Sequence, residues 1–77
     1  MSHTPHELIE EFPGKAETIQ SLKQTNAHFA RLAEDYHQLN REIHAIETHV
    51  KPASEDTERQ LRRQRMQLKD AIAALLA

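Results

Sequence analysis

The sequence predicts an all-α protein, built as an antiparallel helical hairpin of the coiled-coil type with one or two short helices before it. Three observations predict this fold class. The 77 residues include one Gly and three Pro among many helix-forming Ala, Glu, Gln, Arg and Leu residues. Two apolar stripes with heptad spacing lie on either side of Pro52. The two stripes mirror each other in residue number, as helices that run in opposite directions require.

Residues 1–14 are predicted to form a short helical segment of their own. Residues 4–7 read Thr-Pro-His-Glu, which is the order of a capping box with Thr4 as the cap and Glu7 reaching back. Pro13-Gly14 ends this helix. The segment carries an acidic, apolar face with three large apolar residues: Leu8, Ile9 and Phe12. We expect this face to cover a flank of the hairpin, or else to lie across a partner chain.

Residues 15–77 are predicted to form the hairpin domain, with long helices at about 27–50 and 55–76. A helical pattern starts near Lys15, but two successive steps of three around Phe29 break the heptad phase. This break predicts an interruption at Thr25-Asn26, because Asn is a good N-cap. Pro52 ends the first long helix, since it lacks an N–H group and disfavours helical geometry in the residue before it. Ser54 or Asp56 is expected to cap the second long helix.

The two seams fix a register across the hairpin. Each step forward along the first seam is matched by an equal step back along the second, so that the facing pairs are Phe29–Leu75, Leu32–Ile72, Tyr36–Leu68, Leu39–Arg65, Ile43–Leu61 and Ile46–Glu58. The first seam then continues to Val50. A single hairpin of this length leaves other apolar side chains to cover, which favours either packing of the N-terminal segment or a dimeric four-helix bundle.

Arg65 is the polar exception on the seam, where it faces Leu39 next to Asn40 and Glu42. A polar residue at such a position often sets register or oligomeric state at some cost in stability. Asn40 and Glu42 are the two candidate partners for its guanidinium. The alternative is that the Arg65 stem packs while the head reaches solvent.

Basic residues gather on the outward face of the second long helix. We call the following five residues the basic stripe: Arg59, Arg62, Arg63, Met66 and Lys69. One interpretation is a docking surface for an acidic protein segment or for phosphate. The other is a solvated helix face with ion pairs Glu55–Arg59 and Glu58–Arg62 at i, i+4 spacing. No aromatic residue interleaves the stripe, which weakens the case for single-strand nucleic-acid binding.

Several classes of function are disfavoured. The sequence has no Cys, so neither a disulfide nor a thiolate metal site is expected. The six His lack the spacing of a helical zinc motif, so we expect neither a metal nor another cofactor. A hairpin offers no cleft for convergent catalytic groups, and no nucleophile or phosphate-binding motif is present, so we expect no enzymatic activity.

The chain is also expected to work away from membranes. No apolar run approaches the length of a membrane span, and residues 1–12 carry no Lys or Arg, unlike a signal or transit peptide. The lack of Cys is compatible with a reducing compartment. We therefore expect a cytoplasmic protein.

Two pieces of the sequence are specific enough to compare with known families, the tripeptide Leu68-Lys69-Asp70 and the string Tyr36-His37-x-Leu39-x-x-Glu42-Ile43. The stretches that contain them resemble the YdcH-like family of short bacterial proteins, whose domain has no known function. The resemblance covers roughly residues 15–76. It implies a coiled-coil hairpin, and it brings no activity, cofactor or catalytic residue.

These observations predict a small, non-enzymatic interaction module that self-associates, with a dimer favoured, and presents a charged helical face to a protein partner. A nucleic-acid-binding protein that contacts phosphates through the basic stripe without reading sequence is the alternative. A purely structural coiled-coil oligomer is the second alternative.

Overall fold

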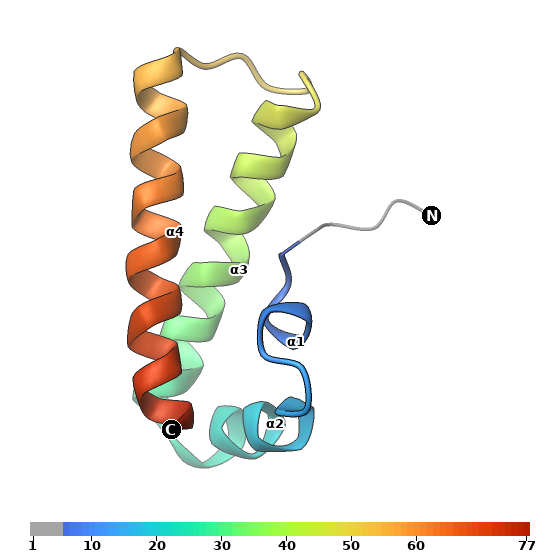
Figure 1. Cartoon of the computed structure of the whole chain (residues 1–77), viewed down its shortest axis with the longest axis vertical. Helices are drawn as coiled ribbons and strands as arrows, with labels where there is room; N and C mark the ends of the chain where they lie inside the picture. The colour runs from blue at the N-terminus through green and yellow to red at the C-terminus, as the bar shows by residue number, and fades with distance from the viewer. Residues whose placement is uncertain (1–5) are drawn as a thin grey trace.

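A computed structural model describes residues 6–77 and confirms an all-α fold. Within these residues the elements are α1 (Leu8–Glu11), α2 (Ala16–Thr25), α3 (Ala27–Glu47) and α4 (Glu55–Leu76), with no strand. Helices α3 and α4 lie side by side and run in opposite directions, while α1 and α2 lie beside the end of the hairpin that holds the C-terminus (Figure 1). The antiparallel hairpin with two short helices before it is therefore confirmed. Coiled-coil packing of the seam stays a prediction.

The predicted interruption before Phe29 is confirmed. Helix α2 ends at Thr25, and Asn26 has an extended backbone (φ −129°, ψ 104°). The Asn26 side chain accepts a hydrogen bond from the Phe29 backbone N–H at 3.1 Å, so it caps α3. Of the two predicted caps for α4, Ser54 is the one used, because its hydroxyl accepts from the Thr57 backbone N–H at 3.1 Å.

Helix α1 begins one turn later than the sequence predicted. Glu7 is extended and stands before the helix, and its backbone N–H bonds the Glu10 carboxylate at 3.4 Å. A capping box therefore forms with Glu7 and Glu10. The predicted cap, Thr4, lies outside the described residues. Helix α1 ends before Pro13-Gly14, as predicted.

The prediction that the first long helix reaches Val50 is wrong. Helix α3 ends at Glu47, and His49 takes a left-handed conformation with φ 63°. The N–H groups of Val50 and His49 then bond back to the Ala45 and Ile46 carbonyls, which is the pattern of a Schellman motif. These bonds satisfy backbone carbonyls in the last turn of α3. The helix therefore ends before the position at which Pro52 alone would have ended it. Val50 is 79% exposed and does not belong to the seam.

The main core lies where the four helices of residues 6–77 meet. Within this range it comprises seven buried residues: Leu8, Ile19, Phe29, Ala33, Tyr36, Ile72 and Leu76. Ala33 follows the seam residue Leu32, which is only partly buried. Burial on α3 thus shifts toward the side that α1 and α2 cover, and the core is wider than the predicted two-helix seam.

Helix α1 and Phe12 of the N-terminal segment cover a flank of the hairpin, as the first of the two expectations had it. Leu8 is 7% exposed and belongs to the core, and Phe12 packs against it. Ile9 is 53% exposed and does not take part. Among the described residues, no helix is both long and apolar enough to cross a membrane.

Candidate functional site

The basic stripe lies along α4, but its members have different surroundings. The Arg62 guanidinium lies 2.7 Å from the Glu47 carboxylate on α3 and 2.8 Å from the Glu58 carboxylate one turn before it. The hydrogen bond from Arg62 to Glu47, with the negative charges of both carboxylates, raises the pKa of Arg62. Arg62 therefore acts as a clamp between the end of α3 and the start of α4. The predicted Glu58–Arg62 pair is confirmed, and the Glu47 contact was missed.

Lys69 ties α1 to α4. Its ammonium lies 3.2 Å from a carboxylate oxygen of Glu11 and 6.0 Å from the centre of the Phe12 ring. The acidic N-terminal segment thus already contacts one end of the basic stripe. Lys69 has a structural partner within the same chain and is less available than its position in the sequence suggested.

Arg59, Arg63 and Met66 form the outward part of the stripe. Arg59 lies 3.5 Å from Asp56 and not in the predicted pair with Glu55. Within residues 6–77, Arg63 makes no hydrogen bond or ion pair, and Met66 is 65% exposed. The three residues stand at i, i+4 and i+7, so they share one face of the helix. This face is the part of the stripe that remains open.

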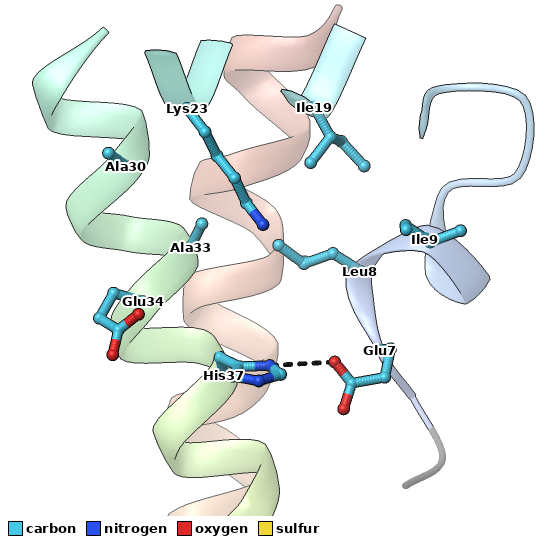
Figure 2. A pocket seen from close by; sticks show the side chains of 9 residues that line it. All are labelled: Glu7, Leu8, Ile9, Ile19, Lys23, Ala30, Ala33, Glu34 and His37. Atoms are coloured by element: carbon cyan, nitrogen blue, oxygen red, sulfur yellow. Dashed lines mark ion pairs between the residues drawn. The ribbon is translucent and has the colours of Figure 1, made fainter. Parts of the chain in front are cut away.

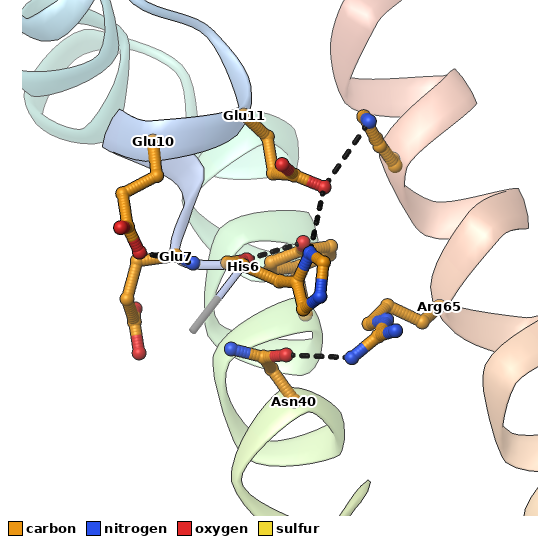
Figure 3. Close-up of polar contacts among 8 residues, drawn as sticks. His6, Glu7, Glu10, Glu11, Asn40 and Arg65 are labelled. Carbon is orange, nitrogen blue, oxygen red and sulfur yellow. Dashed lines mark hydrogen bonds and ion pairs between the residues drawn. The ribbon is translucent and has the colours of Figure 1, made fainter. Parts of the chain in front are cut away.

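Arg65 crosses from α4 to α3 and donates a hydrogen bond to the Asn40 side-chain oxygen at 2.9 Å (Figure 3). Asn40 is 1% exposed, so this bond satisfies a buried polar group. Of the two candidate partners for Arg65, Asn40 is the one in contact. Glu42 instead lies 2.6 Å from the Lys51 ammonium. A role of Arg65 in setting register or oligomeric state stays a prediction.

Tyr36 joins the core to the chain just before α1. Its hydroxyl donates to the His6 backbone carbonyl at 2.6 Å. Burial, with the nearby negative charges of Glu11 and Glu7, raises the pKa of Tyr36 to about 12, although the Arg65 charge acts in the opposite sense. Sequence reasoning missed this link, although a tyrosine on the buried seam signals that its hydroxyl needs a partner.

Two carboxylates of the N-terminal segment complete the attachment of α1. Glu7 lies 3.0 Å from the His37 imidazole, and Glu11 lies 3.4 Å from the His6 imidazole as well as beside Lys69. Partial burial acts to raise the pKa of Glu11, but hydrogen bonds and charge from Lys69 and His6 outweigh it, so the pKa lies below its ordinary value. Figure 3 shows His6 and Glu11 facing α4 from the α1 side.

Open hollows flank α1 on two sides. A hollow of about 500 Å³ lies between α1, α2 and α3 (Figure 2), lined by Glu7, Leu8, Ile9, Ile19, Lys23, Ala30, Ala33, Glu34 and His37. A second, of about 420 Å³, lies between α1 and α4 and is lined by His6, Glu11, Tyr36, Arg62, Arg65, Met66, Lys69 and Asp70. The lining of the second hollow combines three strong cations with the carboxylates of Glu11 and Asp70.

No group of three metal-ligating side chains occurs within residues 6–77. His3, which the sequence places three residues before His6, lies outside the described part of the chain.

The fold and these surfaces define a class, a small all-α protein whose long helical hairpin carries a shorter N-terminal attachment. The family model "Protein of unknown function (DUF465)" matches residues 29–76, and the chain belongs to this family. The match spans most of α3 and all of α4, and it agrees with the YdcH-like resemblance of the sequence. Helices α1 and α2 lie outside the matched residues. No curated protein and no solved structure was found to match the chain.

Proposed function

We propose that this protein is a non-catalytic, cytoplasmic interaction module that binds an acidic helical segment of another protein on the outer face of α4. Arg59, Arg63 and Met66 form the docking surface. The strongest support is that Arg63 has no ion-pair partner within residues 6–77 and lies on the same helix face as the exposed Met66. The other three cations of the stripe are paired within the chain, Arg62 and Lys69 with carboxylates on other helices and Arg59 with Asp56 on α4 itself.

The chemistry of this surface suits a helix that carries both acidic and apolar residues. Met is unbranched and adapts its shape, so an exposed Met is a common element of protein-binding surfaces. Two Arg on the same face would orient the partner and accelerate its association through charge attraction. Recognition would follow the helix-docking mode, with contacts at i, i+4 and i+7.

The contacts within the chain weaken the nucleic-acid alternative. The whole chain has a net charge of −2, and two of the five stripe residues already pair with carboxylates on other helices. Few cations are left to neutralise phosphates, and binding to phosphate would fall steeply with salt. A purely structural oligomer, the other alternative, gives no role to the open face around Arg63.

A charge-reversal pull-down tests the proposal. The tagged chain is compared with Arg59→Glu/Arg63→Glu and with a charge-matched control, Arg31→Glu/Arg41→Glu, whose residues are exposed on α3. We expect one stoichiometric protein that resists nuclease and moderate salt, is lost at least about tenfold in the α4 variant, and is retained in the control. Equal loss from both variants, or recovery of nucleic acid alone, contradicts the proposal.

A further inference from the structure

We propose that two copies of this chain exchange their N-terminal segments, so that α1 of one copy docks on α3 and α4 of the other. We call residues 6–12 the arm. The inference goes beyond the proposed function, because it concerns the surface under α1 and makes no use of Arg59, Arg63 or Met66. The occupant of that surface is thus a second copy of the same chain.

The arm depends on the hairpin for its shape. A helix of four residues is too short to form alone in water. The hairpin holds it through the buried Leu8 side chain and through three polar contacts, which are Tyr36 with the His6 carbonyl, His37 with Glu7, and Lys69 with Glu11. Each of these polar contacts joins the arm to α3 or α4, so the hairpin itself supplies the polar part of the docking site.

The arm is also separable from the rest of the fold. Hollows of about 500 Å³ and about 420 Å³ lie on its two sides, and Ile9 is 53% exposed and lies outside the core. Leu8 is the arm residue that is buried in the core, with Phe12 partly buried. Release of the arm therefore leaves the packing between α3 and α4 in place.

The connection between α1 and α2 provides a hinge. Residues 12–15 are outside the helices, and Gly14 has φ 83°. A Cβ atom placed at Gly14 would meet no other atom within 4 Å, so the backbone there is open on its outer side. A rotation at this turn can direct the arm toward a neighbouring molecule without disturbing α2.

Charge and shape favour a second copy as the occupant. The arm carries three Glu and no Lys or Arg, and the surface that receives it presents Lys69, His37 and Arg65. The arm of another copy has the same Leu and the same carboxylates at i, i+4, so it can reform every contact seen within one chain. Exchange of an identical element is a low-cost route to a dimer for this reason.

Two charge reversals test the exchange. Within one chain, Glu11→Lys sets a second ammonium beside Lys69, and Lys69→Glu sets a second carboxylate beside Glu11. In a mixture of the two variants, an exchanged heterodimer brings the two unchanged residues together as an opposite-charge pair. We expect native mass spectrometry and light scattering to show at least about tenfold more heterodimer in the mixture than homodimer in either variant alone. The double variant Glu11→Lys/Lys69→Glu restores the pair within one chain and should behave as the wild type.

The wild-type chain supplies the second part of the test. Its dimer fraction should rise with concentration, should fall at least about tenfold in Leu8→Asp, and should be unchanged in Ile9→Asp, the matched control at an exposed neighbouring position. Circular dichroism checks that the hairpin remains helical in each variant. A mixture that contains only single chains, or a heterodimer that survives Leu8→Asp, overturns the proposal.

Discussion

The two ends of the hairpin are built differently. At the end near α1 and α2, four helices meet around Phe29 and Tyr36, which are both 0% exposed. At the loop end, α3 and α4 pack against each other with no further helix from residues 6–77, and Ile43 and Ile46 are buried while Val50 is 79% exposed. A hollow of about 600 Å³ lies beside the loop, and the ion pairs there are on the surface.

This difference shows how unevenly a small helical protein distributes its stability. Burial of large apolar side chains contributes roughly 1.5–3 kcal/mol each, whereas an exposed ion pair contributes between zero and about 1 kcal/mol. The end that holds the C-terminus should therefore be the more stable one, and the loop end should open first. Four measurements can break or sharpen that comparison.

The largest effect is expected from Phe29→Ala. The ring is fully buried among residues of several helices, so its removal leaves a cavity and should lower the free energy of unfolding by about 3–5 kcal/mol. In a chain of this size that loss should populate the unfolded state at room temperature. Urea unfolding followed by circular dichroism measures it, with Val50→Ala at the loop end as a control that should change stability by less than about 0.5 kcal/mol. Similar losses in the two variants would contradict the comparison.

The second effect comes from the titration of Tyr36. Its pKa is raised from 10.0 to about 12, so the folded state holds the phenolic proton more tightly than the unfolded state does. This difference stabilises the folded state by about 2–3 kcal/mol in total. The stabilisation is fully present below pH 10 and is lost as the pH rises through about 12. Unfolding measured between pH 9 and 12 should show this loss in the wild type and a smaller one in Tyr36→Phe, which has no ionisable group at that position. Parallel curves for the two proteins would show that Tyr36 does not supply the loss.

Much of the hairpin could be predicted because it rests on local chemistry. Asn26 and Ser54 are good caps wherever a helix begins, and each accepts the expected backbone hydrogen bond. The heptad seam identified α3 and α4 as partners. The end of α3 could not be predicted in the same way, because His49 takes a left-handed conformation that glycine usually supplies.

The place of the basic stripe on α4 was predictable from the sequence, but the contacts of its side chains were not. The basic stripe follows from helical periodicity. Its members Arg62 and Lys69, however, pair with carboxylates on α3 and α1, and the tertiary structure determines which carboxylate lies close to each of them. For the same reason, the sequence could not decide between Asn40 and Glu42 as the partner of Arg65. In the structure Arg65 bonds the Asn40 side chain, whereas Glu42 pairs with Lys51. The burial of Ala33, which lies on α3 outside the seam, depends on where α1 and α2 pack. No sequence pattern within α3 specifies that position.

The helix caps provide the third test, because one lies at each end of the hairpin. Asn26→Ala and Ser54→Ala each remove a hydrogen bond of 3.1 Å from a backbone N–H, and each should cost about 1 kcal/mol of unfolding free energy. Ser54→Ala also removes the bond that the Ser54 hydroxyl donates to the exposed Thr57 hydroxyl at 3.0 Å. Asn26 is partly buried whereas Ser54 is exposed, so the Asn26 variant should lose more. Asn26→Asp and Ser54→Asp keep an acceptor and should restore most of the loss. A larger loss at Ser54 would mean that the loop end limits stability.

The smallest effect is expected at the Arg62 clamp. The Arg62 side chain is 48% exposed, and its pairs with Glu47 and Glu58 join the end of α3 to the start of α4 in contact with solvent. Arg62→Gln should leave the unfolding midpoint almost unchanged but should speed amide hydrogen exchange in the last turn of α3, because the loop end then opens more often. The amides near Phe29 should exchange as before. Arg63→Gln is the matched control, since Arg63 has no ion pair within residues 6–77, and a salt concentration of about 1 M should reduce the difference between the two variants. Faster exchange at both ends of the hairpin would show that the clamp supports the whole core, and the two ends would then open as one unit.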